Sequence, residues 1–235
     1  MLENLPLYLN ISFIFTTALA WLMVLLLINT ASKRVDSKVS TGILLAIGCW
    51  LILQSLLSFT GLYKSFPSAI PPKIILFGVF PAVMAILWLF NSRKGKQFID
   101  RLSMQMLTYV HLIRIPVELC LYGLFINGAV PELMTFEGRN MDILAGLSSP
   151  LVGFFGIGKS KMGKFSLLTW NFICLGLLLN IVVNAVLSAP SPFQQFAFDQ
   201  PNVAILNFPF SWLPTFVVPL VLFAHLASIR KIISK

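Results

Sequence analysis

The sequence contains few charged residues, and acidic residues are the scarcest of them. Only 11% of its 235 residues are charged, and 8 of these are Asp or Glu, whereas a soluble domain carries roughly 25% charged residues. This composition excludes an ordinary soluble fold, a coiled coil and a disordered chain. It also argues against a nucleic-acid-binding surface, so the net charge of +9 needs another explanation.

Metal-binding and catalytic motifs are also missing. The three cysteines, Cys49, Cys120 and Cys174, each lie inside an apolar run, where free cysteine behaves as a small hydrophobic residue. No CxxC, HExxH or GxSxG motif is present. We therefore expect no disulfide, no metal site and no cofactor, with one alternative given below.

Hydrophobic residues are abundant, at 57% of the chain. A bilayer crossing takes ~20 predominantly apolar residues, so this composition predicts an all-α membrane helix bundle, with residues 1–235 forming a single transmembrane domain. Apolar runs between polar breaks predict about seven crossings. Their expected spans are Tyr8–Asn29, Thr41–Tyr63, Ile74–Asn91, Ser103–Asn127, Ile143–Gly158, Ser166–Leu187 and Trp212–Ile229.

Basic residues concentrate in alternate connections, which predicts the orientation because lysine and arginine are retained on the cytoplasmic side. The connections after the first, third, fifth and seventh runs hold Lys33, Arg34, Lys38, Arg93, Lys94, Lys96, Arg101, Lys159, Lys161, Lys164, Arg230, Lys231 and Lys235. The opposite set holds Lys64, Lys73 and Arg139. We therefore expect an external N-terminus and a cytoplasmic C-terminus in a bacterial inner membrane. The net charge of +9 then follows from this retention of basic residues on the cytoplasmic side, and attraction to anionic membrane lipids would add to it.

Ionisable residues inside the expected spans are His111, Arg114, Glu118 and His225. Such residues are costly in a bilayer and are functional candidates by default. At 100° per residue, His111, Arg114 and Glu118 fall within roughly 60° of one another and should point into the bundle. We expect Arg114 and Glu118, at positions i and i+4, to pair. That pair could equally be purely structural.

Polar residues on other spans fall at matching depths, estimated from the ~1.5 Å rise per helical residue. They form two expected tiers. The outer tier is Gln54, Glu118 and Asn180, and the inner tier is His111, Asn171 and His225, with Arg114 between the two. Together these residues predict a polar intramembrane cavity that serves as a ligand-binding path or proton relay, although each amide alone is more often a contact between helices. His111 and His225 also form the one possible imidazole pair for a b-type haem.

The connection after the fourth run is the most polar stretch expected outside, and the run that follows it is short. Glu137, Arg139, Asn140 and Asp142 in this connection are candidates for an outer vestibule. The following run, ILAGLSSPLVGFFGIG, combines glycine, serine and proline, a pattern typical of a broken transporter helix. A tilted helix packed closely through its glycines explains the same pattern.

Three segments carry a resemblance to other proteins. MTFEGRNMDILAGLSSP, WLPTFVVPLVLFAHLASIR and LIRIPVELCLYGLF resemble a group of uncharacterised bacterial multi-pass integral membrane proteins. The likeness covers roughly the fourth, fifth and seventh expected spans. It implies the membrane class and supplies no activity and no site residues.

The first functional hypothesis is binding or transport of a small solute, linked to protons through Glu118. Arg114 would be its countercharge and the histidines an inner relay. One alternative is an intramembrane enzyme acting on a lipid or isoprenoid, with Glu118 or Asp142 as acid or base. Another is a scaffold subunit with a protein partner, which predicts that side chains or the partner fill the polar face of residues 103–127.

Overall fold

The computed structural model describes residues 5–31, 37–65 and 68–234, and these ranges contain helices and turns but no strand. Lys33, Arg34 and Lys235, which entered the orientation argument, lie outside the described residues. The helices are α1 (Leu7–Ala31), α2 (Ser37–Phe59), α3 (Phe80–Asn91), α4 (Arg93–Arg101), α5 (Met104–Tyr109), α6 (Arg114–Ile126), α7 (Ile143–Leu151), α8 (Lys164–Ser188) and α9 (Val218–Ile233). Shorter 3-10 or π-helical segments are Ile75–Val79, Val110–Ile113, Glu132–Met134, Val152–Gly158, Ala204–Leu206 and Leu213–Val217.

Within the described ranges, five helical stretches are long and apolar enough to cross a membrane. They are Leu7–Ala31, Val39–Phe59, Met104–Ile126, Lys164–Ser188 and Leu213–Ile233, each overlapping one expected span. A sixth is obtained when Ile75–Asn91 and the bent helix Arg93–Arg101 count as one span. The remaining apolar helix, Ile143–Gly158, is shorter. The chain is therefore an all-helical membrane protein.

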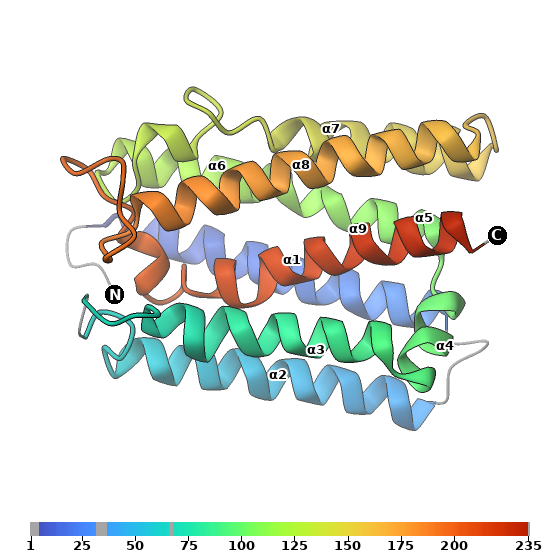
Figure 1. Cartoon of the computed structure of the whole chain (residues 1–235), viewed down its shortest axis with the longest axis horizontal. Helices are drawn as coiled ribbons and strands as arrows, with labels where there is room; N and C mark the ends of the chain where they lie inside the picture. Colours follow the sequence, from blue (N-terminus) through green and yellow to red (C-terminus); the bar gives the residue numbers. More distant parts are fainter. Residues whose placement is uncertain (1–4, 32–36, 66–67, 235) are drawn as a thin grey trace.

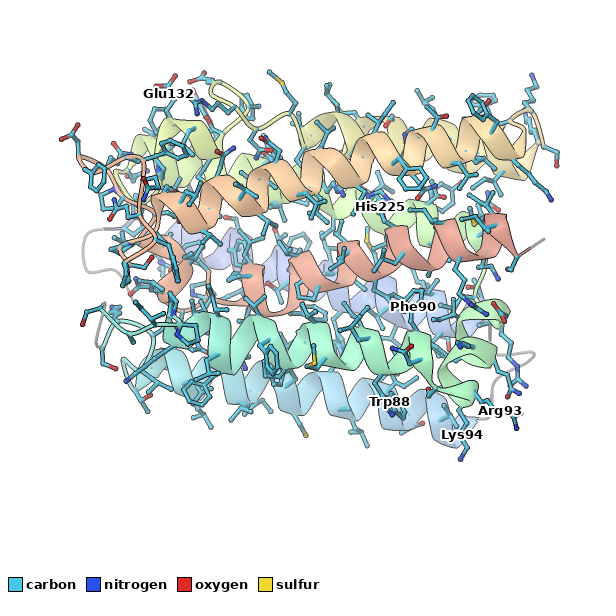
Figure 2. The ribbon with its side chains drawn as sticks, in the orientation of Figure 1. Trp88, Phe90, Arg93, Lys94, Glu132 and His225 are labelled. Atoms are coloured by element: carbon cyan, nitrogen blue, oxygen red, sulfur yellow. The ribbon has the colours of Figure 1, made fainter. Side chains whose placement is uncertain are left out.

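Apart from α4, the helices run side by side along the long axis of the molecule, and α1 begins at the opposite end of the bundle from the end of α9 (Figure 1). One end, here called the basic end, holds α4, the α7–α8 connection and the last turn of α9. The other, here called the loop end, holds the α2–α3, α6–α7 and α8–α9 connections. Figure 2 shows Arg93 and Lys94 at the basic end and Glu132 at the loop end.

α9 lies at the centre of the bundle, in contact with α3, α4, α5 and α8. In contrast, α2 lies at the edge and keeps apolar side chains such as Leu45 and Ile52 exposed, as expected of a helix facing lipid. Two indole N–H groups fix α2 to the start of the α9 span. Trp50 Nε1 donates to the Thr215 carbonyl at 2.9 Å, and Trp212 Nε1 donates to the Leu51 carbonyl at 3.1 Å.

α4 is a helix in a region where the sequence predicts a connection. It begins where the Ser92 hydroxyl accepts a bond from the Gly95 N–H at 3.0 Å, and it turns 88° away from the preceding helix. Ile99 is fully buried, and Lys231 Nζ on α9 donates to the Asp100 carbonyl at 2.6 Å. α4 is rich in charged residues and only nine residues long, so hydropathy does not identify it as a helix with one buried side.

Candidate functional site

The span Met104–Ile126 presents a polar face to the bundle interior. A 3-10 turn, Val110–Ile113, joins α5 to α6 just before Pro116, which has no N–H to donate to the Leu112 carbonyl. His111, Arg114 and Glu118 all point inward and are at most 2% exposed. Buried polar groups at this depth need partners, and most of those partners come from other helices.

Arg114 pairs with Asp142, which corrects the pairing with Glu118 expected from sequence. Its Nη1 lies 2.7 Å from Asp142 Oδ1 and also donates to the Cys174 carbonyl at 3.2 Å. Its Nη2 lies 2.8 Å from His225 Nε2. The guanidinium therefore connects α6 to the start of α7, to α8 and to α9. A pair with Glu118 would require two side chains on adjacent turns of one helix to bend toward each other. Asp142 approaches the guanidinium from another segment of the chain.

The hydrogen bonds of His225 define its tautomer. Guanidinium N–H groups only donate, so Nε2 must accept the bond from Arg114. Nδ1 must then carry the proton, which it donates to Asn171 Oδ1 at 3.1 Å. The Asn171 amide is itself oriented by its Nδ2, which donates to the Leu167 carbonyl at 2.9 Å. His225 is thus a neutral imidazole in a fixed orientation, near the middle of the bundle (Figure 2).

His111 stacks on His225, with ring centroids 3.9 Å apart and an interplanar angle of 23°. Trp170 meets the His111 ring edge-on at 5.5 Å. Among the described residues, neither ring nitrogen of His111 has a hydrogen-bond partner. The inner tier of His111, Asn171 and His225 therefore is a contiguous cluster with Arg114. Rings in direct contact leave no space for a porphyrin between them, and both nitrogens of His225 are already bonded, so this pair does not fit axial haem ligation.

Glu118 is held by Asn140, a neutral amide. Asn140 Nδ2 lies 2.6 and 2.7 Å from the two carboxyl oxygens and 3.0 Å from the Met134 carbonyl. The amide orientation is fixed because Asn140 Oδ1 accepts from the Asp142 N–H at 3.0 Å. Two amide hydrogens cannot serve three acceptors at once. At least one acceptor therefore lacks a full hydrogen bond from this amide.

The outer tier expected from sequence does not assemble. Gln54 lies in a separate cluster, where it accepts from the Tyr63 hydroxyl and donates to the Phe77 carbonyl at 3.1 Å. Asn180 is exposed and donates to the Arg139 carbonyl at 2.9 Å. Depth along a helix does not specify the direction in which a side chain points. Equal depth therefore did not bring Gln54, Glu118 and Asn180 together.

The residues assigned to an outer vestibule separate into two pairs. Glu137 and Arg139 are exposed at the loop end, where the Arg139 guanidinium lies 5.6 Å from the centre of the Phe196 ring. Asn140 and Asp142 are buried at 0% and 5% exposure, and they supply the partners of Glu118 and Arg114. The α6–α7 connection thus folds back into the bundle at its last three residues.

The short run Ile143–Gly158 is helical throughout, with a π-helical second half, Val152–Gly158, after Pro150. Its glycines allow close contact with the neighbouring span. A Cβ on Gly146 would lie 2.8 Å from Ile115 Cγ1 and 3.2 Å from the Ile115 backbone nitrogen. Gly153 packs in the same way on the Tyr109 ring. This geometry favours the closely packed helix over the broken helix.

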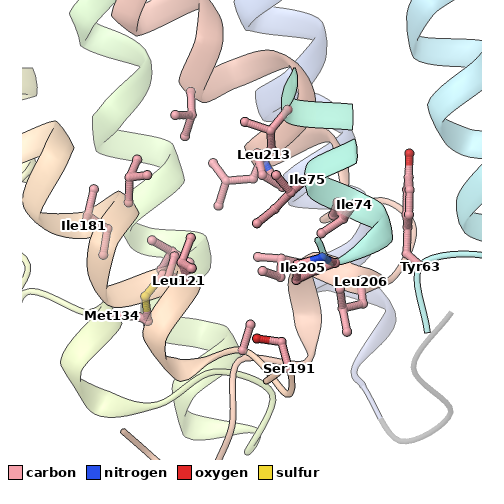
Figure 3. A pocket seen from close by; sticks show the side chains of 18 of the residues that line it. Tyr63, Ile74, Ile75, Leu121, Met134, Ile181, Ser191, Ile205, Leu206 and Leu213 are labelled. Atoms are coloured by element: carbon pink, nitrogen blue, oxygen red, sulfur yellow. The ribbon is translucent and has the colours of Figure 1, made fainter. Parts of the chain in front are cut away.

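A cavity of about 350 Å³ adjoins Glu118 and Asp142. Its walls come from α6, α8, the segment before α3 and the start of the α9 span, and they are mostly aliphatic (Figure 3). Leu121, Ile181 and Leu213 are representative wall residues, and Ser191 lies toward the α8–α9 connection (Figure 3). The sequence predicts a polar cavity, whereas most of this lining is aliphatic. Aliphatic wall residues are indistinguishable in sequence from ordinary packing until the helices are placed.

Comparisons with known proteins return nothing for this chain: no family model, curated protein or solved structure matches it. Two geometric features of the structure bear on function. They are the buried polar cluster around Arg114 and the aliphatic cavity beside Glu118.

Proposed function

We propose that this protein binds a small amphiphilic solute in the cavity beside Glu118 and carries it across a bacterial inner membrane, in exchange with protons. One observation carries the proposal. Glu118 is a buried carboxyl that lines a cavity, and a neutral amide holds it in place of a cation. We also propose that the chain belongs with the uncharacterised bacterial membrane proteins it resembles.

Seven crossings and an external N-terminus are part of this proposal. An odd number of crossings is supported by the start of α1 and the end of α9, which lie at opposite ends of the bundle (Figure 1). The basic end gathers Lys94, Lys161 and Arg230 with their basic neighbours, whereas Glu132 and Asp199 lie in connections of the loop end. Retention of basic residues in the cytoplasm then puts the loop end, and the cavity near it, outside.

The charges around the cavity support a chemical role for Glu118. Arg114 is already neutralised by Asp142 at 2.7 Å, and the carboxyl of Glu118 is the additional acid. An ionised carboxyl without a cation is strongly disfavoured in a bilayer. Glu118 must therefore take up a proton or meet a compensating ligand, and this requirement couples the state of the carboxyl to the occupant of the cavity.

The lining determines the kind of solute. Aliphatic side chains of α6 and α8 form most of the wall, with Tyr63 and Ser191 among the few polar groups toward the loop end. Burying an unpaired polar group against such a wall costs free energy, so a sugar or an amino acid is a poor fit. An apolar body with one polar group directed at Glu118 matches this arrangement.

A scaffold subunit is the second candidate, and the inner cluster favours it. Arg114, His225 and Asn171 satisfy one another, so side chains of this chain fill that part of the polar face. A scaffold requires no more of these residues than this. The scaffold function gives the cavity at Glu118 no role, whereas solute binding requires that cavity.

Native mass spectrometry of the protein in a mild detergent distinguishes the two. Solute binding predicts a small-molecule adduct that disappears in Ala185→Trp, because Ala185 on α8 lines the cavity and an indole fills it. Val183→Trp is the matched control, since Val183 is exposed on the same helix and its indole would face lipid. An adduct retained in both variants, or none in the unmodified protein, contradicts solute binding and favours the scaffold.

A further inference from the structure

We propose that the solute is a lipophilic monocation, and that it exchanges with one proton on Glu118. This inference rests on the proposed function and specifies the charge of the solute.

The buried charges near the cavity do not cancel. Arg114 and Asp142 form a neutral pair at 2.7 Å, and both are at most 5% exposed. Glu118, at 1% exposure, then leaves one negative charge whenever it is ionised. A medium of low dielectric strongly favours neutrality, so the cavity should hold one positive charge, carried by either a proton or a ligand.

Within the described part of the chain, no other titratable group that lines the cavity forms an ion pair with Glu118. His225 is a neutral imidazole whose two nitrogens are bonded to Arg114 and Asn171. Lys73 is only partly buried, and its Nζ donates to Ser65 Oγ at 3.1 Å. Both residues lie between α2 and α3. Among the described residues, the titratable groups that line the cavity beside Glu118 are Asp142 before α7, and Tyr63 and Lys73 between α2 and α3. Arg114 on α6 adjoins them through Asp142, and Cys174 on α8 and His225 on α9 contact Arg114.

The aliphatic walls of the cavity favour a cation with apolar substituents. Val117, Leu121, Ile181 and Leu213 offer no hydrogen-bond partners, and this disfavours a hydrated inorganic cation. An alkyl- or aryl-substituted ammonium buries its apolar groups against these side chains. Its charge can then approach the carboxyl without needing a second protein ligand.

The exchange balances in atoms and charge. In the empty state Glu118 is a carboxylic acid, and its proton leaves toward the loop end as the cation enters. The carboxylate that remains accepts from Asn140 Nδ2, at 2.6 and 2.7 Å from its oxygens, and contacts the cation on the cavity side. One positive charge enters and one leaves, so the cavity stays neutral throughout.

Calorimetry on the protein in zwitterionic nanodiscs tests this with three probes. Phenyltrimethylammonium is the cation, tert-butylbenzene is its neutral isostere and benzenesulfonate is the anion. We expect the cation to bind at least tenfold more tightly than either other probe, with affinity that rises with pH. Repeating the titration in buffers of different ionisation enthalpy should show about one proton released for each cation bound.

Glu118→Gln should abolish both the binding and the proton release, whereas Glu132→Gln, an exposed position at the loop end, should leave them unchanged. Cation binding without proton release, or pH-dependent binding retained in Glu118→Gln, would overturn the exchange. The probe comparison needs only the unmodified protein, so the proposal stays falsifiable if a variant fails to fold.

Failure of the cation inference differs from failure of the proposed function. If the neutral or anionic probe binds best and Ala185→Trp removes that binding, the cavity binds solutes but the charge assignment is wrong. If no probe binds and no adduct accompanies the purified protein, both proposals fail together.

Discussion

Arg114 bonds to Asp142, 28 residues further along the chain, although Glu118 lies one turn away on its own helix. This pairing gives different surroundings to the Asp142 and Glu118 carboxyls, which the sequence alone does not distinguish. Asp142 compensates a cation and completes a contact between α6 and α7. Glu118 instead faces a cavity, and its hydrogen bonds within the described residues come from the Asn140 amide. The two carboxyls should therefore respond differently to the same kind of substitution.

Asp142→Asn should be strongly destabilising, because it leaves the Arg114 guanidinium buried without a countercharge. We expect a loss of about 3–5 kcal/mol in the free energy of unfolding, measured by denaturation in mixed micelles. Asp100→Asn is the control, since it removes the partly exposed pair with Arg230 at 3.3 Å. It should cost less than about 1 kcal/mol. Equal losses in the two variants would contradict a compensating role for Asp142.

Glu118→Gln should cost much less, about 1 kcal/mol, because it changes hydrogen bonds to Asn140 and strands no cation. The measurement is the same denaturation experiment. A loss as large as that of Asp142→Asn would mean that Glu118, and not Asp142, is the main partner of Arg114. The double variant Arg114→Gln with Asp142→Asn should recover part of the stability lost in Asp142→Asn, since it restores charge balance.

Gly146→Ala should destabilise the contact between α7 and the neighbouring span. Its new methyl group would meet the Ile115 backbone nitrogen at 3.2 Å, and backbone cannot move aside as a side chain can. Overpacking of this kind costs about 1–3 kcal/mol. Gly176→Ala on α8 is the matched control, because nothing lies within 4 Å of its added methyl, and it should show no loss. Thermal unfolding of the two variants in the same detergent compares them.

Accessibility labelling tests the proposed orientation. Cysteines introduced at Lys94, Lys161 and Glu137 are all at exposed positions, so each can react if its side of the membrane is reached. In a background without Cys49, Cys120 and Cys174, an impermeant maleimide added to intact cells should label position 137 alone. Position 94 or 161 should react only after the membrane is opened. Labelling of positions 94 and 161 but not 137 in intact cells would show that the orientation is the opposite of the one proposed.

Hydropathy and helical spacing predict part of this molecule well. Long apolar runs identify the helices because each run exceeds what packing in a soluble core requires, and the inward face of residues 108–118 follows from the helical period. The partners were not predictable in the same way. Spacing reports neighbours on one helix, whereas Asn140 and Asp142 reach the cluster only because their loop turns back into the bundle. Nothing local in the sequence distinguishes them from Glu137 and Arg139, which stay exposed.

The central position of α9 also has a consequence for how the chain is made. Residues 218–233 are synthesised after the other helices of the described ranges, yet they supply His225 to the Arg114 cluster and Lys231 to the carbonyl of Asp100 on α4. Neither contact can exist while the earlier helices leave the ribosome and enter the bilayer. Until α9 inserts, Arg114 has only Asp142 and the Cys174 carbonyl as partners. Assembly of the Arg114 cluster is therefore incomplete until α9 inserts, and quality control that senses unpaired charge in the bilayer would act on the interval before that insertion.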